Sequence, residues 1–247
     1  MVRMNMNRIL PLLLLLVLFA SCSRKYKVEG VSSVTSLDGK MLYLKTFRDG
    51  QWITIDSAEV VHGLFSASGP SDSVIMVALY MDDEAIMPLV LENGKIEVSI
   101  SNSQLTAKGT PLNNALYEFI DKRNALELKI EELERKEARM VLDGISLEDV
   151  REQLAEEGET LAKEMNSYIK EFISANYENV LGPNVFMMMC GTLPYPVMTP
   201  QVEDILNTAP QSFKSNPLVR EFIDKAKENM KLLEEHRRLE ESNAVRK

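Results

Sequence analysis

The sequence holds only two cysteines, Cys22 and Cys190, and only two histidines, His62 and His236, among its 247 residues. The cysteines are far apart, so no Cys-x-x-Cys pair exists for dithiol redox chemistry, in which a thiolate attacks a disulfide and a neighbouring thiol resolves it. The histidines lack a zinc-binding Cys/His spacing, and no serine or cysteine nucleophile has a histidine base nearby. A glycine-rich phosphate loop is also missing. We therefore expect a non-enzymatic protein without metal or cofactor.

Positive charge is scarce as well, because 28 Lys and Arg residues face 37 Asp and Glu residues, for a formal net charge of −9. Binding to nucleic acid requires a basic stripe that neutralises phosphates, so nucleic acid is not an expected partner. The same acidity argues against electrostatic adhesion to anionic lipid. With 45% apolar and 26% charged residues, the composition is that of a globular protein.

A long apolar run, Ile9 to Phe19, lies near the N-terminus and follows a segment that contains Arg3 and Arg8. This order is typical of a secretory signal peptide. A helix of this length rises roughly 16 Å at about 1.5 Å per residue, whereas the hydrocarbon core of a bilayer is about 30 Å thick. The run is therefore too short to serve as a permanent transmembrane anchor.

The end of this run does not fit ordinary signal peptidase, because Phe19 would occupy the third position before a cut at Cys22. The stretch FASC, which ends at Cys22, instead resembles the lipobox of bacterial lipoproteins, whose cysteine is acylated. We expect residues 1–21 to be removed as a lipoprotein signal peptide and residues 22–27 to form a lipidated tether. Several acyl chains, at about 0.8 kcal/mol per buried methylene, suffice for stable anchoring. The alternative is an incidental cysteine beside a conventional site.

Residues 28–109 alternate short apolar runs with turn signals. Ile96, Val98 and Ile100 alternate with polar residues, as in a sheet with one face in water. Asn93-Gly94 is the strongest hairpin signal, because both residues accept the positive φ of a type I′ turn. Seven or eight strands at this spacing predict an antiparallel β-sandwich or flattened barrel. The other turn signals are Asp38-Gly39, Asp49-Gly50, His62-Gly63 and Asp82-Asp83-Glu84.

Residues 110–247 have the 3.6-residue period of an all-α region, so the predicted fold class is α+β. Helix starts are indicated where a capping residue precedes proline and where Ser146 precedes Asp149 by three positions. The proline starts are Thr110-Pro111, Thr199-Pro200 and Asn216-Pro217. The predicted helices span about residues 111–140, 147–176, 184–191, 200–208 and 217–240.

The first two of these helices carry matching apolar seams and favour a long antiparallel helical hairpin within one chain. An intermolecular coiled coil is the alternative, although Arg123 and Gly158 interrupt the seams. Met187, Met188 and Met189 favour core packing over an adaptable groove.

Cys190 follows these methionines, and its surroundings favour a buried, small hydrophobic side chain. The alternative for Cys190 is a reactive thiol that pairs with another chain in an oxidising compartment. The acidic Asp82-Asp83-Glu84 run favours a solvated hairpin tip over a calcium site, because it lacks the ligand spacing and glycine of a calcium loop. Asp56 and Glu59 are paired carboxylates for which no chemistry is indicated.

The order of MLYLKTF, IDSAEVVHGLFSASG, LVLENGKIEVSIS and AKGTPLNNALYEF after Gly30 resembles a known family. That family is an uncharacterised N-terminal β-domain (DUF4369 type) found in Bacteroidota thioredoxin-like lipoproteins, which are thiol-disulfide oxidoreductases. The resemblance covers about residues 26–120 and extends loosely to about 230. In those relatives a thioredoxin domain with a Cys-x-x-Cys site follows. Here NPLVREFIDKAKENM resembles the segment leading to that domain, which is lacking in this sequence.

Three functions are consistent with these observations. The preferred one is a membrane-anchored, non-enzymatic binding or scaffold lipoprotein that binds the bilayer through acylated Cys22 and an unknown protein partner. The second is an accessory to thiol-disulfide exchange that docks a separate thioredoxin-like protein. The third is a surface lipoprotein that binds carbohydrate or peptide, which rests on fold analogy. Ser23-Arg24-Lys25 lacks the acidity of the surface-export tag in such bacteria, so we expect a cell-envelope protein on the outer membrane that faces the periplasm.

Overall fold

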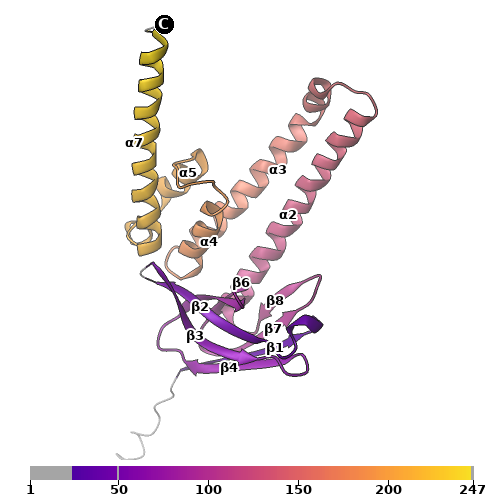
Figure 1. Cartoon of the computed structure of the whole chain (residues 1–247), viewed down its shortest axis with the longest axis vertical. Helices are drawn as coiled ribbons and strands as arrows, with labels where there is room; N and C mark the ends of the chain where they lie inside the picture. The colour runs from indigo at the N-terminus through magenta and orange to yellow at the C-terminus, as the bar shows by residue number, and fades with distance from the viewer. Residues whose placement is uncertain (1–23, 49, 246–247) are drawn as a thin grey trace, which may run out of the picture. The chain divides into compact units, whose positions relative to one another are not determined.

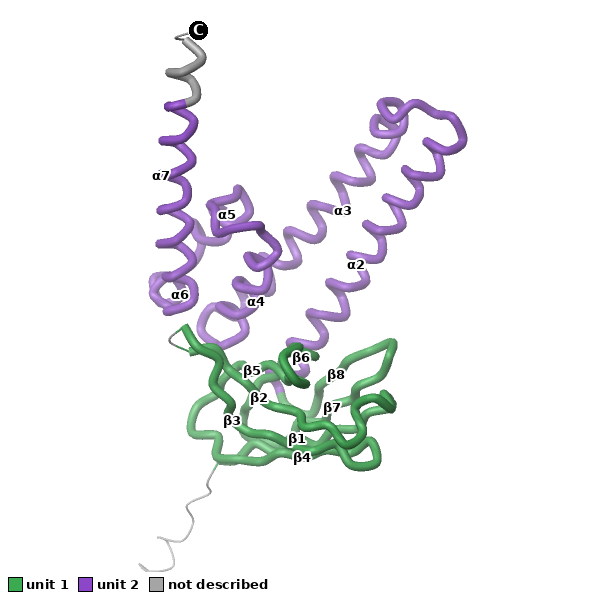
Figure 2. Tube along the Cα trace, viewed as in Figure 1, with its two compact units in different colours: residues 1–110 green, residues 111–247 purple. Residues whose placement is uncertain are grey.

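The computed structural model describes residues 24–48 and 50–245, and the chain divides into two compact units. Residues 1–110 form the β-unit and residues 111–247 form the helical unit (Figure 2). The predicted signal peptide and Cys22 lie outside the described residues. Within the described residues, no helix is both long enough and apolar enough to cross a membrane. Strands precede helices along the chain, so the predicted α+β class is confirmed (Figure 1).

The β-unit consists of two four-stranded sheets. The first sheet has the strand order β4-β1-β7-β8 and the second has the order β3-β2-β5-β6. The sheets do not close on each other, so of the two predicted architectures the open sandwich is observed and the flattened barrel is not. The strands are β1 Lys25–Ser32, β2 Met41–Arg48, β3 Gln51–Glu59, β4 Leu64–Pro70, β5 Ile75–Met81, β6 Glu84–Leu91, β7 Gly94–Ile100 and β8 Leu105–Lys108, with a short 3-10 helix, η1, at Thr35–Leu37.

The core of the β-unit is built from alternate residues of both sheets, because successive side chains of a strand point to opposite faces. Ile96, Val98 and Ile100 on β7 are buried, as their alternation predicts. Leu42 and Leu44 on β2 are buried in the same way in the second sheet. The polar residues between them leave the opposite faces of these strands accessible to solvent.

The predicted hairpin at Asn93-Gly94 is wrong. β6 ends at Leu91 in the second sheet and β7 begins at Gly94 in the first sheet, so the chain crosses between sheets at this point. Asn93 instead accepts a hydrogen bond on Oδ1 from the backbone N–H of Lys25, at 3.0 Å. β7 pairs in parallel with β1, which no local signal predicts. A turn sequence specifies local backbone geometry but not which sheet the next strand joins.

His62 and Gly63 form a tight turn in which both residues have the positive φ that a type I′ turn requires. Their φ values are 53° and 72°, both positive. Val61 and Leu64 flank the turn and exchange two backbone hydrogen bonds, of 2.8 and 3.0 Å. Histidine tolerates this region better than bulky side chains do. The observed position of His62 is therefore explained by backbone geometry.

Gly30 has a steric role in the first sheet. It lies opposite Phe65 on β4, and a Cβ atom at residue 30 would fall 2.0 Å from the Phe65 ring. The buried ring therefore occupies the space that a side chain would need. This close approach of the Phe65 ring to the backbone explains why β1 carries glycine at residue 30.

The helical unit contains six helices among the described residues. The predicted helix at 184–191 begins earlier, at Leu181, because Gly182-Pro183 fit in its first turn and Asn179 Oδ1 accepts from the Leu181 N–H. The last helix continues past the predicted 240, and a four-residue helix precedes it. The helices are α2 Pro111–Leu142, α3 Leu147–Ala175, α4 Leu181–Cys190, α5 Pro200–Thr208, α6 Gln211–Lys214 and α7 Pro217–Val245.

α2 and α3 form an antiparallel hairpin, visible as the two long neighbouring helices in Figure 1. Lys129 pairs with Glu164 and Lys136 with Glu157, so residue numbers rise along α2 while they fall along α3. Ser146 caps the start of α3, since its Oγ accepts from the Asp149 N–H. The predicted intramolecular hairpin is therefore the observed arrangement.

Candidate functional site

Alternation along β2 presents two sets of side chains on opposite faces of the second sheet. Leu42 and Leu44 face the core, so Tyr43, Lys45 and Phe47 face outward. These outward side chains meet neighbours on the adjacent strands. We use the name aromatic surface for five outward residues of β2, β3 and β5: Tyr43, Lys45, Phe47, Trp52 and Tyr80.

The rings of the aromatic surface contact one another edge to face. Trp52 lies 5.3 Å from Phe47 and 5.3 Å from Tyr80 between ring centroids, with interplanar angles of 63°. This geometry suits the ring quadrupoles. Trp52 on β3 therefore reaches Tyr80 on β5, although β2 lies between these strands. The contacts hold Trp52 in place while 55% of its surface stays exposed.

The ammonium group of Lys45 lies among these rings. Lys45 Nζ is 4.6 Å from the ring centroid of Tyr80 and 5.6 Å from that of Tyr43, within the range of cation–π attraction. Lys45 Nζ also donates a hydrogen bond of 3.5 Å to the backbone carbonyl of Asp82. Exposed rings and a fixed ammonium can bind a partner by stacking and by hydrogen bonding.

The edge of the second sheet adjoins the aromatic surface. β3 pairs with β2 and is the edge strand on that side. Gln51 to Ile55 carry no charged side chain, and all five are exposed. Edge strands of soluble proteins usually carry charges or proline, which prevent pairing with another chain. An uncharged edge with β-branched and aromatic residues is suited to accept an added strand.

Asp56 has a structural role between the two sheets. β3 contains a β-bulge at Ile55, which has no partner on β2. Thr54 pairs with Lys45 and Asp56 pairs with Leu44. The Tyr26 hydroxyl on β1 donates to Asp56 Oδ2 at 2.9 Å, while Oδ1 accepts from the Ser57 N–H at 2.8 Å. Burial, then the hydrogen bond and charge of Asp56, raise the pKa of Tyr26 to about 12.

Glu59 is not brought together with Asp56. It is exposed and lies opposite Met41 on β2. The two carboxylates therefore do not form an acid–base pair.

Of the two cysteines singled out from the sequence, Cys190 lies among the residues that the structure describes. It ends α4 as a free, buried cysteine, and burial raises its pKa to about 12. A thiol with this pKa is almost entirely protonated near pH 7, and the protonated thiol is a poor nucleophile. Cys22, the predicted lipid attachment residue, lies outside the described residues.

The acidic and histidine residues singled out from the sequence do not come together in one site. Asp82 and Asp83 form the turn between β5 and β6, and Asp82 has a positive φ of 51°. His236 lies on the exposed part of α7, and His62 lies in the turn before β4. Among the described residues, no group of three His, Cys, Asp or Glu side chains is placed to hold a metal ion.

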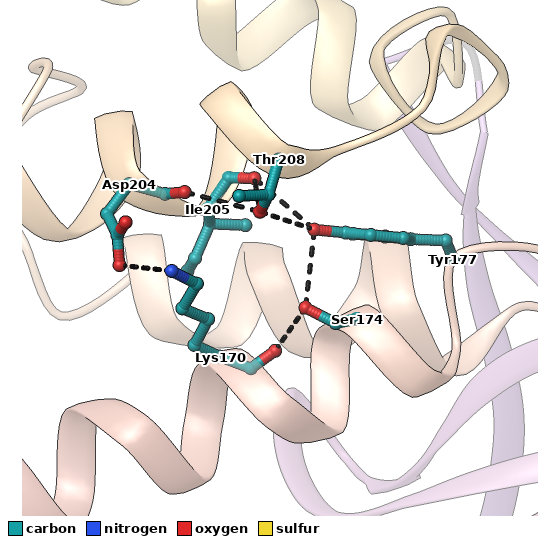
Figure 3. Close-up of polar contacts among 6 residues, drawn as sticks. All are labelled: Lys170, Ser174, Tyr177, Asp204, Ile205 and Thr208. Carbon is teal, nitrogen blue, oxygen red and sulfur yellow. Dashed lines mark hydrogen bonds and ion pairs between the residues drawn. The ribbon is translucent and has the colours of Figure 1, made fainter.

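A polar cluster in the helical unit joins α3 and the segment after it to α5 (Figure 3). Lys170 Nζ donates to Asp204 Oδ2 at 2.7 Å, and the Tyr177 hydroxyl donates to the Ile205 carbonyl at 3.3 Å. Ser174 Oγ donates to the Lys170 carbonyl at 2.7 Å. The polar groups of the cluster are hydrogen-bonded to one another across α3 and α5, so we assign the cluster a structural role.

Sequence reasoning missed all five residues of the aromatic surface, including the three rings of Phe47, Trp52 and Tyr80 that contact one another. The run WITIDSAEV indicates a strand, and its lack of charge at Gln51 to Ile55 is a signal for an edge. The sequence does not show which strands flank it. The grouping of three rings depends on the strand order β3-β2-β5, which skips β4.

Residues 26–116 match the family model of a domain of unknown function, DUF4369. The match covers the β-unit from residue 26 onward and the first residues of α2, and it includes every residue of the aromatic surface. The predicted β-domain type is therefore confirmed. No curated protein matches the chain.

Proposed function

We propose that this chain, whose N-terminal unit is a DUF4369-type β-domain, is a lipid-anchored, periplasm-facing lipoprotein that binds a protein partner. The observation that carries the binding role is Trp52, which is exposed yet held between Phe47 and Tyr80. Trp and Tyr dominate the energetics of protein interfaces, and a pre-ordered ring loses little entropy on binding. The β3 edge supplies main-chain groups for an extended segment of the partner.

The anchor is proposed from the sequence around Cys22. Acylation of its thiol and of the amine freed by cleavage places several hydrocarbon chains in one leaflet, which exceeds the requirement for stable attachment. The absence of an acidic run after Cys22 favours the periplasmic face of the outer membrane. In this arrangement the β-unit is tethered close to the bilayer by only a few residues.

Replacing Cys22 with serine is expected to abolish labelling of the protein by an alkynyl fatty acid fed to the cells, because serine has no thiol to accept the diacylglycerol. The variant should leave the membrane fraction or retain its uncleaved signal peptide. Cys190→Ala is the matched control, because it removes the other cysteine and should keep full labelling. Labelling is measured on gels after coupling a fluorophore to the alkyne. Equal labelling of wild type and Cys22→Ser would refute the anchor.

A photo-cross-linking amino acid at Thr54 tests the binding role. Thr54 is exposed on the β3 edge, and we expect irradiation in cells to join the chain to a discrete protein. Adding Trp52→Ala should lower the yield at least tenfold, since a hot-spot residue contributes about 2 kcal/mol and 1.4 kcal/mol corresponds to tenfold. Yield is measured by immunoblot and the adduct by mass spectrometry.

The control places the same cross-linker at Leu64 on β4, which is 59% exposed at the edge of the first sheet. No adduct, the same adduct at both positions, or a yield unaffected by Trp52→Ala would contradict binding through the aromatic surface.

The aromatic surface also favours a second candidate, carbohydrate binding, because sugar rings stack on exposed tryptophan. The chain has a single tryptophan, so its fluorescence reports directly on this surface. In this case Trp52 emission would respond to oligosaccharides while the cross-linker at Thr54 yielded no protein adduct. If the protein partner is thioredoxin-like, we expect it to bind by non-covalent docking and not through a mixed disulfide with Cys190, because Cys190 is buried.

A further inference from the structure

The helical unit encloses a pocket of about 190 Å³ between α2, α3 and α4, with one residue of α5 at its rim. Two features noted in the sequence meet there, the arginine that interrupts the seam of α2 and the methionine run of α4. Most of the wall is apolar. The pocket lining includes Phe119, Arg123, Met165, Ile169, Met188 and Met189.

The apolar part of this wall combines rigid and adaptable side chains. Phe119 and Ile169 are buried, and the Phe119 ring packs against Phe172 with centroids 4.3 Å apart. Met188 and Met189 are only partly buried. Methionine is unbranched and polarizable, so it adjusts to ligands of irregular shape. A cavity of 150 Å³ binds benzene, so this pocket has room for an apolar body of that size or slightly larger.

Arg123 brings a charged group to this apolar wall. Its Nη2 donates to Asn124 Oδ1 at 3.1 Å, and its Nε lies 3.3 Å from Glu127 Oε1. The Nε atom is nevertheless buried and makes no hydrogen bond, although the whole side chain is 30% exposed. An unsatisfied buried donor is costly, and a carboxylate is the acceptor that matches a guanidinium best.

We propose that this pocket binds a small monocarboxylate with an apolar body about as large as a benzene ring. The ligand carboxylate accepts hydrogen bonds from Arg123, and the apolar body lies against Phe119 and the methionines. Glu127 also lines the pocket and pairs with Arg123, so the ligand carboxylate shares the guanidinium with Glu127, and a second ligand carboxylate is disfavoured by repulsion. This site lies in the other unit from the aromatic surface and does not depend on the proposed function.

Phenylacetate is the probe for the test, with 2-phenylethanol as the uncharged analogue. The full chain in detergent is labelled with ¹³C at its methionine methyl groups, and the signals of Met165 and Met188 are assigned by leucine substitution. We expect phenylacetate to shift these signals saturably, with a Kd on the order of 1 mM. 2-Phenylethanol should bind at least tenfold more weakly, because it cannot pair with the guanidinium.

Arg123→Gln should weaken phenylacetate binding at least tenfold, and Arg123→Lys should restore part of it by returning the charge. Arg135→Gln is the matched control, because Arg135 forms an equivalent i,i+4 ion pair with Glu131 on the same helix but lies outside the pocket, 64% exposed. It should change the Kd less than twofold. Thermal unfolding checks that each variant is folded.

Three results would overturn the proposal. They are unchanged methionine signals with phenylacetate, equal binding of phenylacetate and 2-phenylethanol, and equal weakening by Arg123→Gln and Arg135→Gln. If Arg123→Gln fails to fold, the comparison of the two probes on the wild-type chain and on Arg123→Lys decides the question.

Discussion

Phe186→Ala is expected to lower the free energy of unfolding of the helical unit by about 3–5 kcal/mol, the cost of truncating a buried phenylalanine. Phe186 on α4 is completely buried. Its ring meets Phe213 on α6 at 5.7 Å and Phe222 on α7 at 5.4 Å between centroids, both nearly perpendicular. Alanine removes these contacts and leaves a cavity among three helices. This aromatic cluster joins α4, α6 and α7, which are short or largely exposed helices. Few other buried contacts hold these helices together, so they do not compensate for the lost packing.

Urea unfolding followed by circular dichroism at the helix signal measures this loss. Leu233→Ala is the control, because Leu233 on α7 of the same unit is 45% exposed and its truncation should cost less than about 1 kcal/mol. A further expectation is faster hydrogen exchange in α7, which contacts α4 and α6. An equal, small effect of both substitutions would show that Phe186 is not a central packing residue of this unit.

Stability of the β-unit is expected to fall between pH 10 and 12 because of Tyr26. Burial is the main cause that raises its pKa from 10.0 to about 12, and the hydrogen bond and charge of Asp56 add to it. The folded state therefore holds the proton more tightly than the unfolded state. The stabilisation is complete below pH 10 and is lost as pH rises through 12. At 1.36 kcal/mol per pKa unit, the loss amounts to about 2–3 kcal/mol.

Tyr26→Phe isolates this contribution. The variant should be less stable than wild type near pH 7, because Asp56 Oδ2 loses its donor, and the difference between the proteins should shrink as pH rises toward 12. Unfolding of the β-unit is followed by the emission maximum of Trp52, the single tryptophan. Tyr195→Phe is the control, because that side chain is 47% exposed in the other unit. A stability difference that does not change with pH would argue against this linkage.

Several local features could be predicted from sequence because they depend on residues a few positions apart. Thr199 and Pro200 start α5, and Thr199 Oγ1 accepts from the Val202 N–H as a cap should. Ser146 does the same for α3. The Asn93-Gly94 hairpin failed although its local signal is strong, since its strands join different sheets.

The candidate sites could not be predicted in the same way. Trp52 and Tyr80 contact each other only because β5, not β4, follows β2 in the sheet. Arg123 and Met188 share a pocket only because α4 packs against the α2–α3 hairpin. Sequence reasoning noted both Arg123 and the methionines, but it had no means to bring them together.

The sequence by itself determined the change from strands to helices near residue 110 and the main helix starts. These follow from side-chain periodicity and helix caps, which act over a few residues. The tertiary structure alone decided the aromatic surface, the Asp56–Tyr26 bond and the pocket at Arg123. Each of these joins residues about 30 or more positions apart, and such contacts depend on strand order and helix packing, which are set by burial across the whole unit.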